Sequence, residues 1–355
     1  MADPRTGGPT RRTLLRAGAG LLAAPAVLRP AQAAEQITIA DNGGPYGPAF
    51  RKAFYDPFEQ ATGVKVVNVV HPPEPTAQFK SLVDTKSTIW DVVLVSPGHV
   101  WRLAKPKNYL EPLGLTPAEA PGVMPEMIWP GYLGIDVFAT TLAYRTDKYG
   151  ENGPQSWADF WNVQKFPGRR ALYKQATGPM EIALMADGVE PSQLYPLDLD
   201  RGFRSLDKIR KHIAVWWGSG AQSTQLLQSG EVDMLMIWNA RAQAAIDGGA
   251  PAKVVWNQGL FSSDGWSIPL GSPKAEIGKK FARFCTDPAR QAVFTEFLSY
   301  GPTNLQAYDR IDPKRAALLP TYPSNLKLMR QSNDEWWGDN FQRVSERFED
   351  WMLSG

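Results

Sequence analysis

The chain has 355 residues, 38 Lys and Arg against 36 Asp and Glu, and 43% of its residues are hydrophobic. This near neutrality disfavours nucleic acid or an anionic membrane as the partner, because either would require a clustered basic surface. The length favours two lobes over one small core. The single cysteine, Cys285, excludes an intramolecular disulfide and a cysteine-based metal cage.

An export signal is predicted over residues 1–33. Arg11 and Arg12 precede a small, apolar stretch at 17–28, which is too short to span a bilayer but suits a signal sequence. An Ala-Gln-Ala cleavage site follows at 31–33. The segment resembles bacterial twin-arginine signals, which predicts a periplasmic protein that folds before export. Without it, 33 basic and 35 acidic groups remain, a net charge of −2.

The next region predicts alternating strands and helices. The expected strands are residues 37–40, 64–70 and 90–95, with a helix at 76–86. Between the first two strands, Phe50, Phe54 and Phe58 recur every four residues, which predicts an amphipathic helix. This rhythm is typical of a parallel α/β sheet, and such sheets bind ligands at the carboxyl ends of their strands. The turns at 42–46 and 96–98 lie at that edge.

The rest of the chain predicts a second lobe. Residues 105–135, rich in Pro and Gly, read as a surface connection, and a strand at 136–144 is interpreted as the crossing. Further helices are expected at 157–163, 181–186, 196–212, 222–228, 240–247, 274–285 and 288–298, and further strands at 232–238, 254–256 and 267–269. We expect one lobe to comprise 36–138 and 266–303, and the other 139–265 and 304–355.

The last helix has the clearest start. Ser332 and Glu335 form a capping box at its beginning. A single apolar seam then follows, made of Trp337, Phe341, Val344, Phe348 and Trp351. Because the seam covers only two heptads, docking onto a lobe is favoured over a coiled coil.

Catalytic signatures are missing from the sequence. The three histidines, His71, His99 and His212, form no His-Glu-x-x-His motif or close pair, so no metal site is predicted. Neither a Gly-x-Ser-x-Gly elbow nor a phosphate-binding Walker loop occurs. An exported two-lobed α/β chain of this kind suggests a binding protein without a cofactor, not an enzyme.

Four segments resemble one family. They are Gly-Glu-Val-Asp-Met-Leu-Met-Ile-Trp-Asn at 230–239, Phe-Ser-Ser-Asp-Gly-Trp-Ser-Ile-Pro at 261–269, Tyr-Gly-Pro-Thr-Asn at 300–304 and Ser-Trp-Ala-Asp-Phe-Trp at 156–161. Their order is similar to that in the spermidine/putrescine-type extracellular solute-binding proteins of ABC importers. The resemblance implies a type II periplasmic binding protein, in which two α/β lobes, each with a mostly parallel sheet flanked by helices, close on a ligand. A membrane permease would then be the partner, and a monomer is expected.

The resemblance and the strand-end turns give a set of candidate ligand-binding residues. They are Gly43, Tyr46, Ser96, Ser219, Gln222, Trp238, Asp264, Trp266 and Tyr300. By the resemblance, Trp238 would stack on the ligand, Asp264 would pair with its ammonium group, and Tyr46 and Tyr300 would add contacts. Trp266 alternates with Asp264 along the expected strand and is a candidate second platform.

Departures from the polyamine binders leave two ligand classes open. Those proteins carry a Trp where this chain has Gly43, another where it has Ser262, and second-lobe acids near 173–178, where this chain has none. The segment 216–222 offers hydroxyl, amide and helix N-terminal groups that suit an anion, and Arg241 could serve likewise. The ligand is therefore a polyamine such as putrescine, or alternatively an ω-amino acid or another zwitterion or anion. Iron is disfavoured, since no Tyr-Tyr pair occurs.

Two other roles stay open at this stage. The fold also supports an exported enzyme, as in porphobilinogen deaminase, for which Cys285 would be the available nucleophile. Because Cys285 lies in a predicted helix, we expect it to be packed instead. A chemoreceptor partner is compatible with binding as well.

Overall fold

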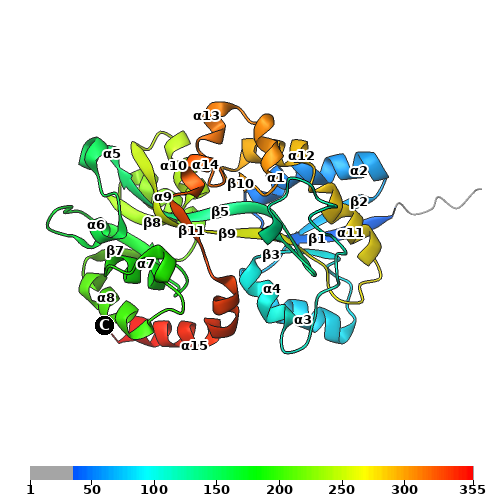
Figure 1. Cartoon of the computed structure of the whole chain (residues 1–355), viewed down its shortest axis with the longest axis horizontal. Coiled ribbons are helices and arrows are strands. Elements are labelled where there is room, and N and C mark those ends of the chain that lie inside the picture. Colours follow the sequence, from blue (N-terminus) through cyan, green and yellow to red (C-terminus); the bar gives the residue numbers. More distant parts are fainter. Residues whose placement is uncertain (1–34, 355) are drawn as a thin grey trace, which may run out of the picture. The chain divides into compact units, whose positions relative to one another are not determined.

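The computed structural model describes residues 35–354, so the predicted export signal at 1–33 lies outside the described residues (Figure 1). Within that range no helix is both long and apolar enough to cross a membrane.

Within residues 35–354, eleven strands form one mixed sheet. They are β1 (Gln36–Asp41), β2 (Lys65–Val70), β3 (Val92–Val95), β4 (Ile128–Trp129), β5 (Tyr132–Arg145), β6 (Arg170–Tyr173), β7 (Ile213–Trp217), β8 (Met234–Trp238), β9 (Ala252–Ser267), β10 (Gly301–Pro302) and β11 (Met329–Gln331). The main path runs β2-β1-β3-β9-β5-β8-β6-β7. Pairing is parallel at both ends, among β1, β2 and β3 and among β6, β7 and β8, and antiparallel around β9 and β5. Two parallel α/β units are thus joined through two long strands.

Helices cover both faces of the sheet at each end (Figure 1). At the β1–β3 end they are α1 (Tyr46–Phe50), the π-helical turn η1 (Arg51–Tyr55), α2 (Asp56–Thr62), α3 (Thr76–Thr85), α4 (Pro97–Ala104), α11 (Ala275–Phe284) and α12 (Pro288–Phe297). At the β6–β8 end they are α6 (Trp157–Trp161), α7 (Pro179–Ala186), α8 (Leu199–Arg210), α9 (Gly220–Ser229), α10 (Asn239–Asp247) and α15 (Asp334–Leu353). Shorter turns are η2 (Pro125–Met127), α5 (Thr146–Tyr149), η3 (Gly150–Asn152), η4 (Pro191–Gln193), η5 (Leu305–Asp309), α13 (Pro313–Ala316) and α14 (Pro323–Leu326).

Aromatic packing fixes the first helices in place. Phe50, Phe54 and Phe58 are fully buried along the helical stretch from α1 to α2, which confirms the prediction from their spacing. Phe50 stacks on Phe294 of α12 with 5.1 Å between ring centroids. Burying one such ring contributes about 1.5–3 kcal/mol. The start of α1, at Tyr46, is therefore held firmly against the sheet.

The strands β5 and β9 pass from one core to the other. β5 contributes Ile135 to the core around Phe50 and Leu142 to the core at the β6–β8 end. The sequence analysis predicted two separate strands in place of β9, and this was wrong. The glycine at 265 does not interrupt β9, because its missing side chain lets the strand lie directly against the backbone of Leu133 and the ring of Tyr132.

One extra residue interrupts the ladder between β5 and β9. Gly134 pairs with Gly265, and the next pair is Asp136 with Asp264, so Ile135 is the additional residue of a β-bulge. A bulge changes which face the following side chains occupy. As a result Asp136 and Asp264 are directly opposite each other.

The C-terminal helix begins one residue later than predicted. Asn333 is the N-cap, and its side chain accepts the Trp336 N–H at 2.9 Å. Ser332 cannot take that role, because its N–H bonds to the carbonyl of Phe261 and continues the pairing of β11 with β9. The expected docking of this helix is confirmed by its buried side chains, Trp337, Val344 and Phe348.

The boundaries of the two lobes, expected after residues 138, 265 and 303, remain predictions. Packing changes from one core to the other between Ala139 and Leu142 in β5 and between Phe261 and Leu260 in β9. The segment 305–322 packs on α12 through a small apolar cluster, with Arg315 Nε donating to the Thr295 carbonyl at 2.7 Å. This part of the segment expected in the second lobe therefore accompanies the β1–β3 end.

Candidate ligand-binding site

Two carboxylates face each other on the central strands. Asp136 and Asp264, here called the acidic pair, are cross-strand neighbours and are both buried. Asp264 Oδ2 accepts hydrogen bonds from the Tyr46 hydroxyl at 2.8 Å and from Asn42 Nδ2 at 3.3 Å. Neither carboxylate oxygen of Asp136 has a hydrogen-bond partner within residues 35–354. The pair therefore has acceptor capacity that the described chain leaves unused.

Burial sets the protonation of the acidic pair. It raises the pKa of Asp136 well above the usual range, and the charge of Asp264 raises it further. Burial also raises the pKa of Asp264, although the Tyr46 hydrogen bond and the charges of His99 and His71 lower it in part. Two carboxylate charges on directly opposite residues repel each other. A cation placed beside them would therefore favour the ionised form of both carboxyl groups.

Two tyrosines line up beside the acidic pair. Tyr46 is the first residue of α1, and Tyr300 directly precedes β10, with 5.7 Å between their ring centroids. Both are nearly fully buried. Burial raises the pKa of each phenol well above its ordinary value, so both rings carry neutral hydroxyl groups. The structure thus brings three of the expected residues, Tyr46, Tyr300 and Asp264, into one place.

A positively charged side chain also lies near Tyr300. Arg241 is the third residue of α10, and its charge lowers the pKa of Tyr300 against the larger raising effect of burial. Its Nε is buried and has no acceptor among residues 35–354. The side chain lies against the start of α9, where a Cβ at Gly220 would be 2.6 Å from Nε. A guanidinium beside a helix N-terminus suits a carboxylate.

The expected residues Ser219 and Gln222 cap that same helix. Ser219 Oγ accepts the Gln222 N–H at 3.3 Å, and Gln222 Oε1 accepts the Gly218 N–H at 2.8 Å. Both side chains are exposed. Their oxygens therefore stabilise α9, and a role in ligand binding stays a prediction.

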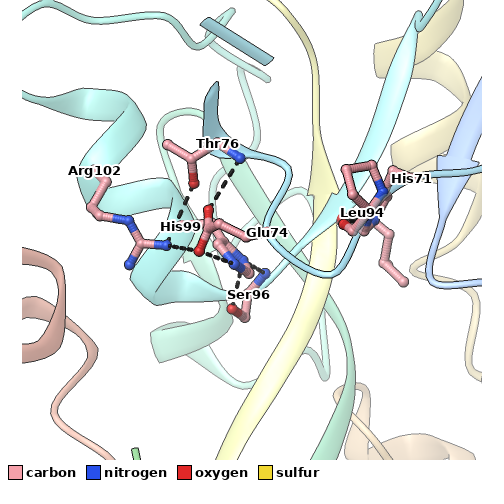
Figure 2. Close-up of polar contacts among 8 residues, drawn as sticks. His71, Glu74, Thr76, Leu94, Ser96, His99 and Arg102 are labelled. Atoms are coloured by element: carbon pink, nitrogen blue, oxygen red, sulfur yellow. Dashed lines mark hydrogen bonds and ion pairs between the residues drawn. The ribbon is translucent and has the colours of Figure 1, made fainter. Parts of the chain in front are cut away.

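Ser96 follows β3 next to the acidic pair. Val95 pairs with Gly265, so Ser96 comes beside Asp264 at the strand end. Its hydroxyl is 2.8 Å from His99 Nδ1, which also accepts the Ser96 N–H at 3.2 Å (Figure 2). Ser96 and His99 thus form a capping box at the start of α4, so the Ser96 hydroxyl helps to begin this helix.

Trp238 is half-buried at the end of β8. The Trp238 ring packs at a steep angle against two other rings. Its centroid lies 5.2 Å from that of Trp217 and 5.5 Å from that of Tyr173. Within the described residues no hydrogen bond or ring contact joins it to Asp264. Its stacking role therefore remains a prediction.

Two of the residues expected in the ligand-binding site, Trp266 and Gly43, have roles in the structure of the protein itself. Trp266 does lie on the same side of β9 as Asp264. It is, however, fully buried between Phe50 and Phe281. Its ring therefore has no surface free for a ligand, and the prediction of a second stacking platform is wrong. Gly43 has φ +64°, and a Cβ there would lie 2.7 Å from a methyl group of Val70. The turn thus requires glycine for backbone reasons.

The described residues contain no group of three or more His, Cys, Asp or Glu that could hold a metal ion. Cys285 is buried and its pKa is raised by burial, which disfavours the thiolate that a nucleophile needs.

Sequence reasoning missed Asn42 and Asp136. Asp136 is the one charged residue inside the otherwise apolar stretch Tyr132–Tyr144. An acidic residue in a buried strand is rare without a partner. The charge of Asp136 is visible in the sequence. Regular alternation along the expected strand, however, would place its side chain on the opposite face from the one it occupies, because the sequence does not reveal the bulge at Ile135.

Comparison with known proteins gives consistent results. Residues 53–321 match the model of the bacterial extracellular solute-binding proteins. The chain is 35% identical over 331 residues to the gamma-aminobutyric acid-binding protein of Pseudomonas aeruginosa, which covers 90% of this chain and 92% of that protein. It is 24% identical over 292 residues to the spermidine/putrescine-binding periplasmic protein of Escherichia coli, with 79% and 82% covered.

A solved structure has the same fold. The ABC transporter substrate-binding protein of Bradyrhizobium japonicum superposes with a TM-score of 0.84 at 37% identity, over 90% of this chain and 99% of that one. The two-lobed α/β fold of type II periplasmic binding proteins is thereby confirmed. The predicted resemblance to polyamine binders was too narrow, because the aminobutyrate-binding relative shares more of the sequence.

Proposed function

We propose a ligand for this chain, which belongs to the family of bacterial extracellular solute-binding proteins: a short ω-amino acid such as 4-aminobutyrate. The protein is the solute-binding component of an ABC transporter and not an enzyme, as its relatives are binding proteins. The proposal concerns which solute it captures and how.

One observation carries the proposal. Buried polar atoms of an acidic and a basic side chain, the carboxylate oxygens of Asp136 and the Nε of Arg241, both lack a partner within residues 35–354, and both side chains lie near enough to Tyr300 to affect its pKa. A buried charge without a partner is costly. A zwitterion supplies an ammonium group for the acidic pair and a carboxylate for Arg241, so a single ligand compensates both.

The remaining residues have defined parts in this arrangement. The Tyr46 hydroxyl and Asn42 orient Asp264 through their hydrogen bonds. The Ser96 hydroxyl, at the strand end beside Asp264, would add a contact to the ammonium group, and the α9 start, with Ser219 and Gln222, suits the carboxylate. Trp238 would close over the alkyl chain. Contacts from both lobes exist together only when the lobes close, and this differential affinity drives closure.

The similarity to a gamma-aminobutyric acid-binding relative at 35% identity supports this ligand. A polyamine is the second candidate, and one observation favours it. Asp334 accepts hydrogen bonds at 3.2 and 3.3 Å from the hydroxyl of Ser262, two residues before Asp264, and burial raises the pKa of Asp334 to about 7. A second acid would suit a second ammonium group, but Arg241 opposes that ligand.

We further propose that residues 1–33 direct twin-arginine export and that the mature protein acts as a periplasmic monomer. A membrane permease would receive the loaded form. The relatives of this chain support an exported location, and the net charge of −2 after residue 33 suits a soluble carrier.

A thermal-shift comparison tests the ligand. The chain from residue 34 onward, of which 36–355 form one compact unit, is melted with 4-aminobutyrate, putrescine, spermidine, butyrate or n-butylamine. A ligand at 100 times its dissociation constant stabilises the folded state by about 2.7 kcal/mol. We expect a large rise in Tm with 4-aminobutyrate and little with butyrate or n-butylamine. A rise with putrescine but none with 4-aminobutyrate would refute the proposal.

A further inference from the structure

The C-terminal helix is anchored at the β6–β8 end of the sheet. Trp337 Nε1 donates to Glu181 Oε1 in α7 at 2.6 Å, and the hydroxyl of Tyr195 donates to the same oxygen at 2.8 Å. Farther along α15, Trp351 Nε1 donates to Asp207 in α8 at 2.7 Å. This part of α15 is therefore held by the second core.

The first turns of the same helix also contact the β1–β3 end. Trp101 Nε1 in α4 donates to Asp339 Oδ1 at 2.7 Å, and the Arg102 guanidinium lies 4.5 Å from the ring centroid of Phe341. Gly338 leaves no room for a side chain against the indole of Trp101. Figure 1 shows α15 starting beside α4 and ending near α8. The helix α15 thus connects the β6–β8 end of the sheet to the β1–β3 end, and the strands β5 and β9 also connect these two ends.

The α4 side of this contact is connected to the ligand site. Arg102 Nη2 donates to Glu74 Oε2 at 2.7 Å, and the same oxygen is 3.5 Å from His99 Nε2 (Figure 2). His99 Nδ1 in turn bonds Ser96, which lies beside the acidic pair. Burial raises the pKa of Glu74, but its hydrogen bond to His99 and the nearby Arg102 charge lower it far more, so Glu74 is ionised. One turn of α4 therefore touches the ligand site and the next touches α15.

We infer that Trp101 and Arg102 are positioning residues for solute binding, which favour the closed arrangement of the lobes by joining α4 to α15. A contact made only when the lobes are closed raises the population of the closed form. Apparent affinity scales with the fraction of protein that is competent to bind. The inference depends on closure of the two lobes and not on which solute is bound.

Two single variants and their combination test the contact. Trp101→Phe removes the indole donor and keeps an aromatic ring, and Asp339→Ala removes the exposed acceptor from a helical position that tolerates Ala well. Glu349→Ala is the control, since Glu349 is exposed on the same helix and makes no hydrogen bond or ion pair to the described residues. Affinity for 4-aminobutyrate is measured by calorimetry, and the unfolding midpoint in urea is measured without ligand.

We expect each single variant to lower affinity by about threefold to tenfold, the double variant to lower it no further, and the control to match the wild type. Lower unfolding midpoints with unchanged affinity would overturn the inference, because the contact would then serve folding alone. If the wild type does not bind 4-aminobutyrate, the inference is tested by the radius of gyration of the wild type, the variants and the control, each measured without ligand. Expansion of both variants relative to the wild type and Glu349→Ala supports the inference, and unchanged dimensions overturn it.

Discussion

The two charged ends of the site are built on different kinds of support. Asp136 and Asp264 belong to β5 and β9, the two long strands that pair with each other through the middle of the sheet. Arg241 is a half-buried side chain near the start of α10, on a long flexible stem. The acidic end is thus set by the sheet, whereas the basic end depends on the rotamer of one side chain. We infer that the ammonium group is the fixed requirement and the carboxylate the adjustable one.

This difference agrees with the chemistry of the two kinds of relative. 4-Aminobutyrate and putrescine both carry an ammonium group, and only the former carries a carboxylate. Under our proposal, the acidic end would serve both ligand classes, and Arg241 would separate them. A change at the acidic end should therefore weaken the binding of both ligands, and a change at Arg241 should weaken that of 4-aminobutyrate alone.

Asp264→Asn breaks the acidic end and has the largest expected effect. It removes a buried, hydrogen-bonded charge, whose loss from a charge pair costs about 2–5 kcal/mol. Affinity for 4-aminobutyrate and for putrescine should both fall by about thirtyfold or more in calorimetry. Asp350→Asn, on the exposed side of α15, is the control. Unchanged affinity for every ligand would remove Asp264 from the site.

Arg241→Gln breaks the basic end. Affinity for 4-aminobutyrate should fall by about tenfold, since one charge-assisted contact is lost. Affinity for putrescine should stay the same or rise, because a nearby positive charge has gone. The exposed Arg204→Gln on α8 serves as the control. A parallel loss for both ligands would show that Arg241 does not discriminate between them.

The pH dependence sharpens the description of the acidic pair. Both carboxylates have pKa values raised by burial, so ammonium binding, measured from pH 5 to pH 8, should strengthen as the rising pH ionises them. The ammonium and carboxylate of the ligand do not titrate in that window. Because the folded pKa values are raised, the unfolding free energy without ligand should fall over the same range.

Asp136→Asn is the matched variant for this pH series. It removes one of the two titrating carboxylates, whose pKa is raised by burial and by the charge of Asp264, so its stability and affinity profiles should be flatter. Calorimetry and urea unfolding at each pH measure the two quantities. An identical slope in the variant would contradict coupling between the two carboxylates.

Ser219→Ala and Gln222→Ala should have the smallest effects on binding. Both side chains already bond backbone groups around the start of α9, so affinity for 4-aminobutyrate should change by less than about threefold. Loss of the Ser219 cap should lower the unfolding free energy by about 1 kcal/mol. A larger change in affinity than in stability would place these residues in direct contact with the ligand.

The regular parts of the fold could be predicted from the sequence because local patterns encode them. The spacing of Phe50, Phe54 and Phe58, and the apolar run before Trp238, identified a helix and a strand correctly. The helix α4 was missed, since Ser96-Pro97-Gly98 was interpreted as a turn although Ser and Pro also begin helices. The strands β6 and β7 were missed although they are as long as β3 and β8, and β6 begins with the charged Arg170, whose burial the local sequence does not indicate.

The site was only partly predictable for a different reason. Asp264, Tyr46 and Tyr300 followed from a family resemblance, which carries long-range information that periodicity lacks. The neighbours of Asp264 come from residues 42, 46 and 136, far away in the chain, and one of them depends on a bulge. Burial alone disqualified Trp266, and burial is a property of the assembled core.

The bulge at Ile135 has a mechanical consequence. A bulge bends its strand, and like charges directly opposite one another push strands apart. In β5 the bulge and the facing carboxyl groups lie at the same place. The strand β5 also contributes side chains to both hydrophobic cores. Because burial raises the pKa of both carboxyl groups, a captured ammonium group would promote their ionisation at the place where β5 bends, so that binding and the local shape of this strand are coupled.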